Sequence, residues 1–96
     1  MDNATMEMPK YQSYKKVWAL KIKEIIFDSD LKKNSNQETD GSAMITPEEE
    51  GYAPFKVDDA YVRKHKPEVG GYYVVYNEGY KSWSPAGSFE SGYNRI

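Results

Sequence analysis

His65 is the only histidine in this chain of 96 residues, and histidine is the side chain best suited to acid–base chemistry near neutral pH. It stands between Lys64 and Lys66, near the end of a predicted helix. The chain has no cysteine and no second histidine that could complete a metal site. We therefore interpret His65 as a surface residue and expect no metal and no cofactor.

Other residues that could take part in catalysis each have a structural explanation. Ser84 precedes Pro85 where a helix is expected to begin, and a serine in that place caps a helix. Gly70–Gly71 precedes a strand, whereas a phosphate-binding loop follows a strand and opens a helix. The adjacent acids Asp58–Asp59 are of a kind common on protein surfaces. The sequence therefore predicts a protein that is not an enzyme.

Binding chemistry is better represented, because the chain has nine tyrosines, two tryptophans and three phenylalanines. Tyrosine combines a large contact area with a hydrogen-bonding tip, so it serves in small β-domains and at binding surfaces alike. Aromatic rings beside a lysine can stack on a nucleotide and neutralise its charge. Five residues are candidates for such a site: Tyr73, Tyr76, Tyr80, Lys81 and Trp83. The alternative is that the face with Tyr73 and Trp83 is core, with Lys81 at its edge.

These candidates lie on a predicted β-hairpin. Tyr72–Tyr76 is a strong strand, Asn77–Gly79 is a three-residue turn with glycine in the left-handed position, and Tyr80–Trp83 returns. If Tyr76 pairs with Tyr80, the side chains of the two strands alternate between two faces of the hairpin. One face carries Tyr73, Val75, Lys81 and Trp83, and the other carries Tyr72, Val74, Tyr76, Tyr80 and Ser82. Tyr73 then lies opposite Trp83, which is a favourable aromatic pair.

The first ordered segment is predicted from Tyr14 to Phe27. Trp18, Leu20 and Ile22 alternate with other residues at the period of a half-buried strand. The alternation slips at Glu24–Ile26, which predicts a bulge or a kink there. A helix is the rival interpretation, but the density of β-branched residues and the missing N-cap favour the strand.

Between this strand and the hairpin the sequence predicts weaker elements. Residues 28–51 are polar and rich in turn formers, so we expect a mobile loop with at most a short strand at Met44–Thr46. A short strand is expected within Tyr52–Val57, and a helix capped by Asp58 should end before Pro67. The fold class is then α+β: a small antiparallel sheet with a C-terminal hairpin and two short helices. We expect residues 1–13 to form a flexible arm and residues 14–96 to form one domain.

Composition limits the environment and the partners. The net charge is −2 and the pI is near 5.4, so binding to nucleic acid is not expected, although the pairs Lys15–Lys16 and Lys32–Lys33 and the run Arg63–Lys66 are basic. We interpret these basic patches as solvated surface. No apolar stretch approaches the roughly 20 residues of a membrane span, so no membrane partner is expected. The absence of cysteine favours a cytoplasmic location.

The C-terminal part of the chain resembles small accessory proteins of tailed bacteriophages and prophages. The similarity lies in Lys66–Pro85, with Gly-Gly-Tyr-Tyr-Val-Val-Tyr-Asn-Glu-Gly-Tyr-Lys-Ser-Trp-Ser-Pro, and in the following Phe89–Tyr93. Tyr11–Ile22 is similar to the opening strand of these proteins. The resemblance implies a phage origin and the host bacterial cytoplasm as the location. It implies no functional site, because the shared residues are of structural types.

This resemblance led us to expect a non-catalytic binding or inhibitory protein that acts against a host defence system. The expected target is a host protein or a small nucleotide signal. The alternatives are a structural or assembly protein of the virion, or a small nucleic-acid-binding regulator. A homodimer is a further expectation, because the hairpin has more aromatic ring on its two faces than one thin domain can easily cover.

Overall fold

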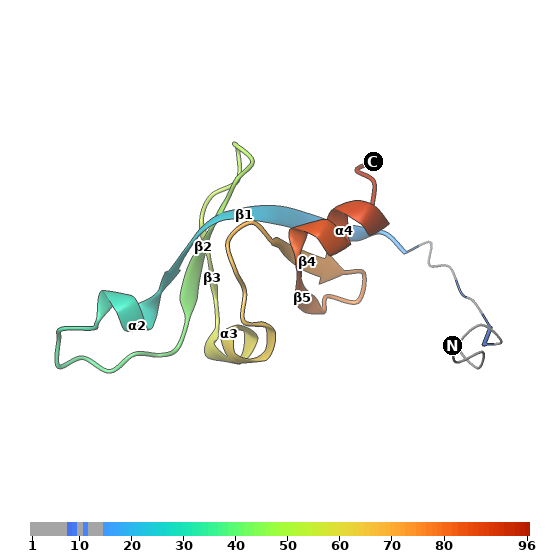
Figure 1. The fold of residues 1–96 in the computed structure, drawn as a ribbon. Helices are drawn as coiled ribbons and strands as arrows, with labels where there is room; N and C mark the ends of the chain where they lie inside the picture. The colour runs from blue at the N-terminus through green and yellow to red at the C-terminus, as the bar shows by residue number, and fades with distance from the viewer. Residues whose placement is uncertain (1–7, 10, 12–14) are drawn as a thin grey trace.

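The computed structural model describes Met8, Pro9, Tyr11 and residues 15–96. The predicted arm of residues 1–13 therefore lies largely outside the described residues. Five strands and three short helices make up the described part of the chain (Figure 1). In chain order they are β1 (Val17–Phe27), α2 (Asp28–Leu31), β2 (Ala43–Pro47), β3 (Phe55–Val57), α3 (Asp59–His65), β4 (Tyr72–Tyr76), β5 (Lys81–Ser84) and α4 (Ala86–Gly92).

The five strands form one curled antiparallel sheet in the order β3-β2-β1-β4-β5. After α3 the chain returns to the sheet as β4, which lies beside β1 rather than beside β3. The two edge strands, β3 and β5, do not pair with each other. A curled, partly open Greek-key sheet of five strands is the architecture of OB-fold domains. The predicted α+β fold class is confirmed, with α2 as one short helix more than the sequence indicated.

Strand β1 belongs to both halves of the sheet. Residues 17–21 pair with β4, and the stretch from Ile22 to Phe27 pairs with β2. The register shifts between Ile22 and Glu24, close to the slip in the sequence pattern that predicted a bulge. The extra residue lets both Ile22 and Ile25 pack in the interior. The bulge also increases the twist of β1, which helps this long strand to pair with both β2 and β4 in a curled sheet.

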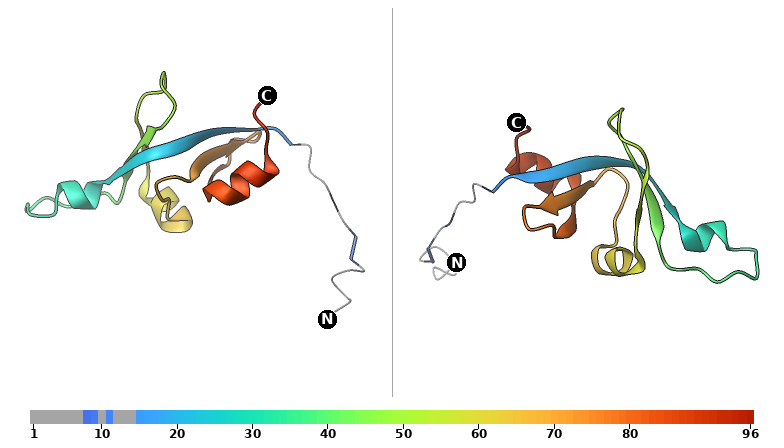
Figure 2. Two further views of the ribbon diagram at one scale, coloured as in Figure 1. Left: turned by 45° about the horizontal axis from the view of Figure 1, so that its top comes forward. Right: turned by 180° about the vertical axis from the view of Figure 1, so that it is seen from behind.

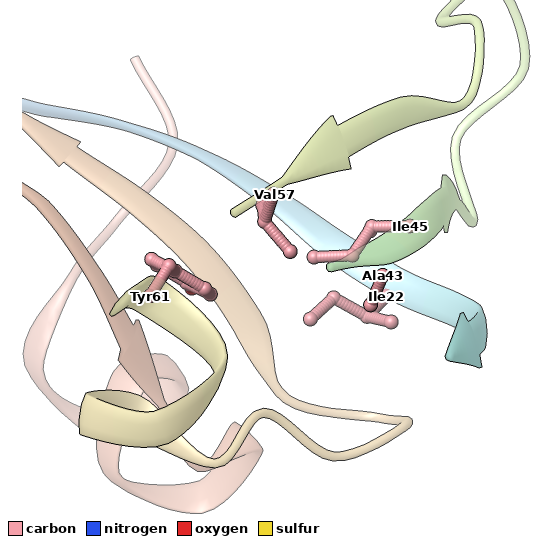
Figure 3. Packing of buried hydrophobic residues seen from close by; sticks show 5 residues of the cluster. All are labelled: Ile22, Ala43, Ile45, Val57 and Tyr61. Atoms are coloured by element: carbon pink, nitrogen blue, oxygen red, sulfur yellow. The ribbon is translucent and has the colours of Figure 1, made fainter. Parts of the chain in front are cut away.

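The interior contains Ile22, Ala43, Ile45, Val57 and Tyr61 (Figure 3). Ile45 is fully buried and Ile22 is nearly so. Burial of one such isoleucine side chain contributes about 1.5–3 kcal/mol to the free energy of folding. Four of the five residues come from the half built by β1, β2 and β3, and α3 contributes the fifth.

Helix α3 closes the gap between the two edge strands. The carboxylate of Asp58 caps the helix by accepting a hydrogen bond from the backbone N–H of Tyr61 at 2.9 Å. The Tyr61 hydroxyl donates to the backbone carbonyl of Ser82 in β5 at 2.7 Å. One helical turn later, the His65 ring is hydrogen-bonded to the backbone of Lys81. The helix therefore occupies polar groups of β5 where a closed barrel would need a fifth pairing, between β3 and β5.

Two expectations from the sequence need correction. The segment 28–51 was expected to add little to the core, yet β2 lies within it and contributes Ala43 and Ile45 to the interior. Its mobility stays a prediction, now for residues 33–38, because Thr39, Asp40 and Ser42 are held by hydrogen bonds. Ser84 was expected to cap α4, but Pro85 holds the capping position and the Ser84 hydroxyl donates to the Pro85 carbonyl at 3.3 Å. Proline fits there because its fixed φ suits the residue that enters a helix.

The C-terminal hairpin has the predicted register. Tyr73 lies opposite Trp83, and Gly79 has a φ of +89° at the end of the turn. Gly71, just before β4, is required by close packing, because a Cβ atom there would lie 2.4 Å from the Trp83 ring. The Trp83 indole therefore packs directly against the backbone of Gly71, where the chain enters β4.

A candidate protein-binding site on the outer face of the sheet

The outer face of the sheet is covered over one half and open over the other. Helix α4 lies over the half built by β4 and β5, and α2 projects at the opposite end of β1 (Figures 1 and 2). The Phe89 ring of α4 stacks on Tyr72 with ring centroids 4.2 Å apart, and Tyr93 stacks on Phe89 at 4.7 Å. Glu90 accepts a hydrogen bond from the Tyr72 hydroxyl at 2.8 Å and pairs with Lys21 at 3.3 Å.

No helix of the described chain covers the other half, built by β1, β2 and β3. Met44 pairs with Ile26 on one side and with Lys56 on the other, so these three form one row across the strands. Ile26 is 39% exposed and Met44 is 38% exposed, whereas Ala43 and Ile45 on either side of Met44 are buried. Leu31 of α2 is 68% exposed. We call Ile26, Leu31, Met44 and Lys56 the α2 patch.

The α2 patch surrounds a shallow pocket of about 190 Å³. Its lining is mainly apolar and comprises Ile26, Asp28, Leu31, Ser42, Ala43, Met44 and Lys56. Pockets for small-molecule ligands usually have volumes of about 300–1,000 Å³, so this one is too small for most of them. It has the size for one apolar side chain of a protein partner.

A fixed network of polar groups forms the rim of this pocket. The Asp28 carboxylate accepts hydrogen bonds from the Thr39 hydroxyl at 3.0 Å and from the Asp40 N–H at 3.1 Å, and it pairs with Lys32 at 3.2 Å. Asp40 pairs in turn with Lys56 at 3.0 Å. The loop that leads into β2 is thereby fastened to the start of α2.

The two carboxylates of the rim are held in their charged forms. The backbone N–H of Asp40 is the main cause that lowers the pKa of Asp28, with further contributions from Thr39 and Lys32. Hydrogen bonds from the hydroxyl and the backbone N–H of Ser42 lower the pKa of Asp40, and Lys56 adds to this effect. Hydrogen bonds to the charged form of a carboxyl favour that form. The rim therefore stays ionised and ordered over the physiological pH range.

An apolar centre with an ordered polar rim is the usual anatomy of a protein–protein contact site. Exposed methionine suits such a site, since its flexible thioether adapts to a partner's shape. The sequence reasoning missed this surface. The only local signal is the alternation in Ala43–Met44–Ile45, which leaves Met44 outside when its neighbours are buried.

The five residues that the sequence suggested for binding do not form one surface. Tyr73 and Trp83 pack against the interior cluster, while Lys81 lies exposed at the end of the same face. Tyr76 and Tyr80 lie together on the other face with ring centroids 5.9 Å apart. A binding role for these residues, and a homodimer through the tyrosine face, stay predictions.

His65 lies in an aromatic setting at the end of α3. Its ring is 4.8 Å from the Tyr61 ring and 5.9 Å from the Tyr80 ring, and the Lys64 ammonium lies 5.0 Å from the centre of Tyr80. Burial lowers the pKa of His65, and the positive charge of Lys64 adds to this, against the hydrogen bond to Lys81. Within the described ranges no three histidine or acidic side chains come together as a metal site. The same part of the chain contains no helix long and apolar enough to cross a membrane.

Comparisons with known proteins give one match. No protein-family model matches the chain, and a search of curated proteins gives no match. Among solved structures, the chain is similar to the monomeric form of the phage L decoration protein, determined by NMR in solution. The two share 29% sequence identity with a TM-score of 0.60. The match covers 92% of this chain and 59% of the other, so the chain spans well under two-thirds of that protein's length.

This match decides between expectations drawn from the sequence. It supports a bacteriophage protein, but not the particular class of accessory proteins that the sequence resembled. The expectation of a protein that acts against host defence is wrong, because the similar structure is that of a decoration protein. The alternative of a structural protein of the virion agrees better with it.

Proposed function

We propose that this chain is a bacteriophage decoration domain, which binds to the assembled capsid and has no catalytic activity. The observation that carries the proposal is the similarity to the phage L decoration protein over 92% of the chain. An identity of 29% together with a TM-score of 0.60 supports more than a shared architecture, since OB-type domains have many unrelated functions. The location that follows is the capsid surface rather than the host cytoplasm.

We further propose that the domain contacts the capsid through the α2 patch. This surface combines exposed apolar side chains, a pocket for one side chain and a rim of ordered charges. Leu31 and Met44 are the expected anchors, since they line the pocket from two different elements, α2 and β2, and both are exposed.

The test is co-sedimentation of the purified chain with heads of the phage that encodes it, prepared without this protein. The unmodified chain should sediment with the heads at a saturable ratio. Leu31→Asp and Met44→Asp should each weaken binding at least about tenfold, as expected for central anchors of an interface. Val69→Asp is the matched control, because Val69 is 62% exposed and lies outside the α2 patch.

The outcomes separate the two parts of the proposal. Failure of the unmodified, folded chain to sediment with the heads would overturn the decoration function. Binding that is equally strong for all three variants would keep that function and overturn the α2 patch as the contact surface. Circular dichroism of each variant checks that the fold is retained.

A further inference from the structure

The N-terminal half of β1 has a neighbouring strand on one side only. Residues 17–21 pair with β4, while β2 pairs with β1 only from Ile22 onward. In Figure 1, β4 and β5 lie on one side of this half, and no described strand lies on the other. An unpaired strand edge presents backbone N–H and C=O groups that can pair with another chain.

Three backbone hydrogen bonds show which backbone groups of β1 face the open side. The N–H of Ile22 donates to Gly71 at 2.8 Å, and its carbonyl accepts from Gly70 at 2.9 Å, so Ile22 faces the segment that enters β4. The carbonyl of Lys21 accepts from the Glu48 N–H at 2.8 Å, on the opposite side. The open side is therefore already used at Lys21, where a neighbouring segment reaches it.

Beyond this point the edge is open. Backbone groups alternate between the two sides of a strand, so Val17 and Ala19 face the same side as Lys21, while Trp18 and Leu20 face β4. The chain after Glu48 turns away from β1 into the β2–β3 loop, so it does not continue along this edge. Val17 and Ala19 therefore offer two N–H and two C=O groups to a strand that would lie in line with β2.

A tryptophan stands at the centre of this edge. Trp18 is 62% exposed, although it pairs with Val75 of β4. It forms a row with Val75 and the exposed Lys81 across β1, β4 and β5. Tryptophan is among the residues most enriched at the energetic centres of interfaces. Its ring can cover a side chain that a newly added strand places beside it.

Lysines flank the tryptophan along β1. Lys16 is exposed at the start of the open segment, and Lys15 and Lys21 add two further charges nearby. Lys21 pairs with Glu90, whereas no described acidic side chain lies within ion-pair distance of Lys16. A partner with acidic side chains would complement this charge.

We propose that the open edge of β1 at Val17–Leu20 is a strand-addition site for an extended acidic segment of a partner protein. Backbone hydrogen bonds to Val17 and Ala19 align the segment, as in other β-augmentation contacts. An apolar side chain of the segment packs on Trp18, and an acidic side chain two residues away approaches Lys16. This site is separate from the α2 patch and does not depend on the decoration function.

A synthetic peptide tests the site in the full chain. The probe is acetyl-Thr-Glu-Thr-Val-Thr-Glu-Thr-amide, in which two glutamates and the central valine share one strand face. Amide hydrogen exchange followed by NMR should show that the Val17 and Ala19 amides exchange faster than those of Trp18 and Leu20 in the free chain. Saturating peptide should slow exchange at Val17 and Ala19 about tenfold and leave Trp18 and Leu20 unchanged, because only the edge amides gain a partner.

Three matched comparisons keep the proposal falsifiable. The same peptide with lysine in place of glutamate should bind at least about tenfold more weakly, and Lys16→Glu should reverse this preference. Trp18→Thr, which retains strand propensity, should weaken the acidic peptide about tenfold. Unchanged edge amides with the acidic peptide, or equal effects of both peptides, would overturn the proposal. So would edge protection that rises with the chain's own concentration, since this indicates a second copy.

Discussion

The outer face of the sheet is covered over one half and open over the other. Over β4 and β5 the chain supplies its own cover, in which Phe89 stacks on Tyr72 and Glu90 joins Tyr72 to Lys21. Over β1, β2 and β3 it leaves Met44 and its neighbours open around a pocket. The fold can therefore cover an outer face with a seven-residue helix, and it does so on one side only. We infer that the open half, built by β1, β2 and β3, binds a partner.

The largest expected effect is the difference in stability between substitutions on the buried face and on the open face of β2. Ile45→Ala should lower the free energy of unfolding by about 3 kcal/mol, because Ile45 is fully buried between β1 and β3. Met44→Ala, one residue away on the open face, should cost less than about 1 kcal/mol. Urea denaturation of both variants measures the difference. Equal losses would show that the open face is part of the stabilising core.

A second variant removes the cover of the closed half. Phe89→Ala takes away the ring that stacks between Tyr72 and Tyr93, and it should cost about 2 kcal/mol, since the ring is only partly buried. Dye binding to exposed apolar surface should rise in this variant, because the Tyr72 ring loses the ring that stacks on it. Val69→Ala serves as the control. If Phe89→Ala left stability unchanged, α4 would not be a fixed cover.

The sequence was sufficient for elements whose signals are local. The β4–β5 hairpin follows from the Asn-Glu-Gly turn, and α3 follows from Asp58 as its cap. Strand β1 and its bulge follow from the period of Trp18, Leu20 and Ile22 and from the slip after it. These signals are carried by neighbouring residues, so no knowledge of the chain's path is needed.

Features that depend on the path of the chain could not be predicted. The short strand expected at Met44–Thr46 is β2, but its place between β1 and β3, which buries Ile45, depends on the path of the chain. Tyr73 and Trp83 look equally fit for a binding face or a core until α3 is placed over them. The α2 patch is open because α4 packs over the other half of the sheet. No local sequence pattern shows on which half α4 packs.

A smaller effect is expected where α3 meets β5. Tyr61→Phe removes the hydroxyl that donates to the Ser82 carbonyl, and it should cost about 1 kcal/mol, the usual net contribution of one such hydrogen bond. The ring contacts with Tyr73 and His65 stay in place, so the loss reports the hydrogen bond alone. Thermal denaturation measures it. A variant as stable as the unmodified chain would show that the hydroxyl makes no net contribution to closing the sheet.

The smallest expected effect concerns acid. Hydrogen bonds lower the pKa of Asp40 on the open half, and the Tyr72 hydroxyl and Lys21 lower the pKa of Glu90 on the covered half. A lowered folded-state pKa stabilises the fold above the unfolded-state pKa, and this stability is lost as the pH falls through the folded-state value. Asp40→Asn and Glu90→Gln should each make the stability fall less steeply below about pH 4. Denaturation midpoints measured across this range test it, and an unchanged slope would contradict the assignment.

The most direct test of the open face as the binding surface is a cryo-electron microscopy reconstruction of phage heads saturated with this chain. The reconstruction should place the outer face of β1, β2 and β3 against the shell, with Leu31 and Met44 at the contact and α4 turned away from it. A reconstruction in which α4 or the β4–β5 hairpin contacts the shell, with Leu31 and Met44 in solvent, would contradict the account.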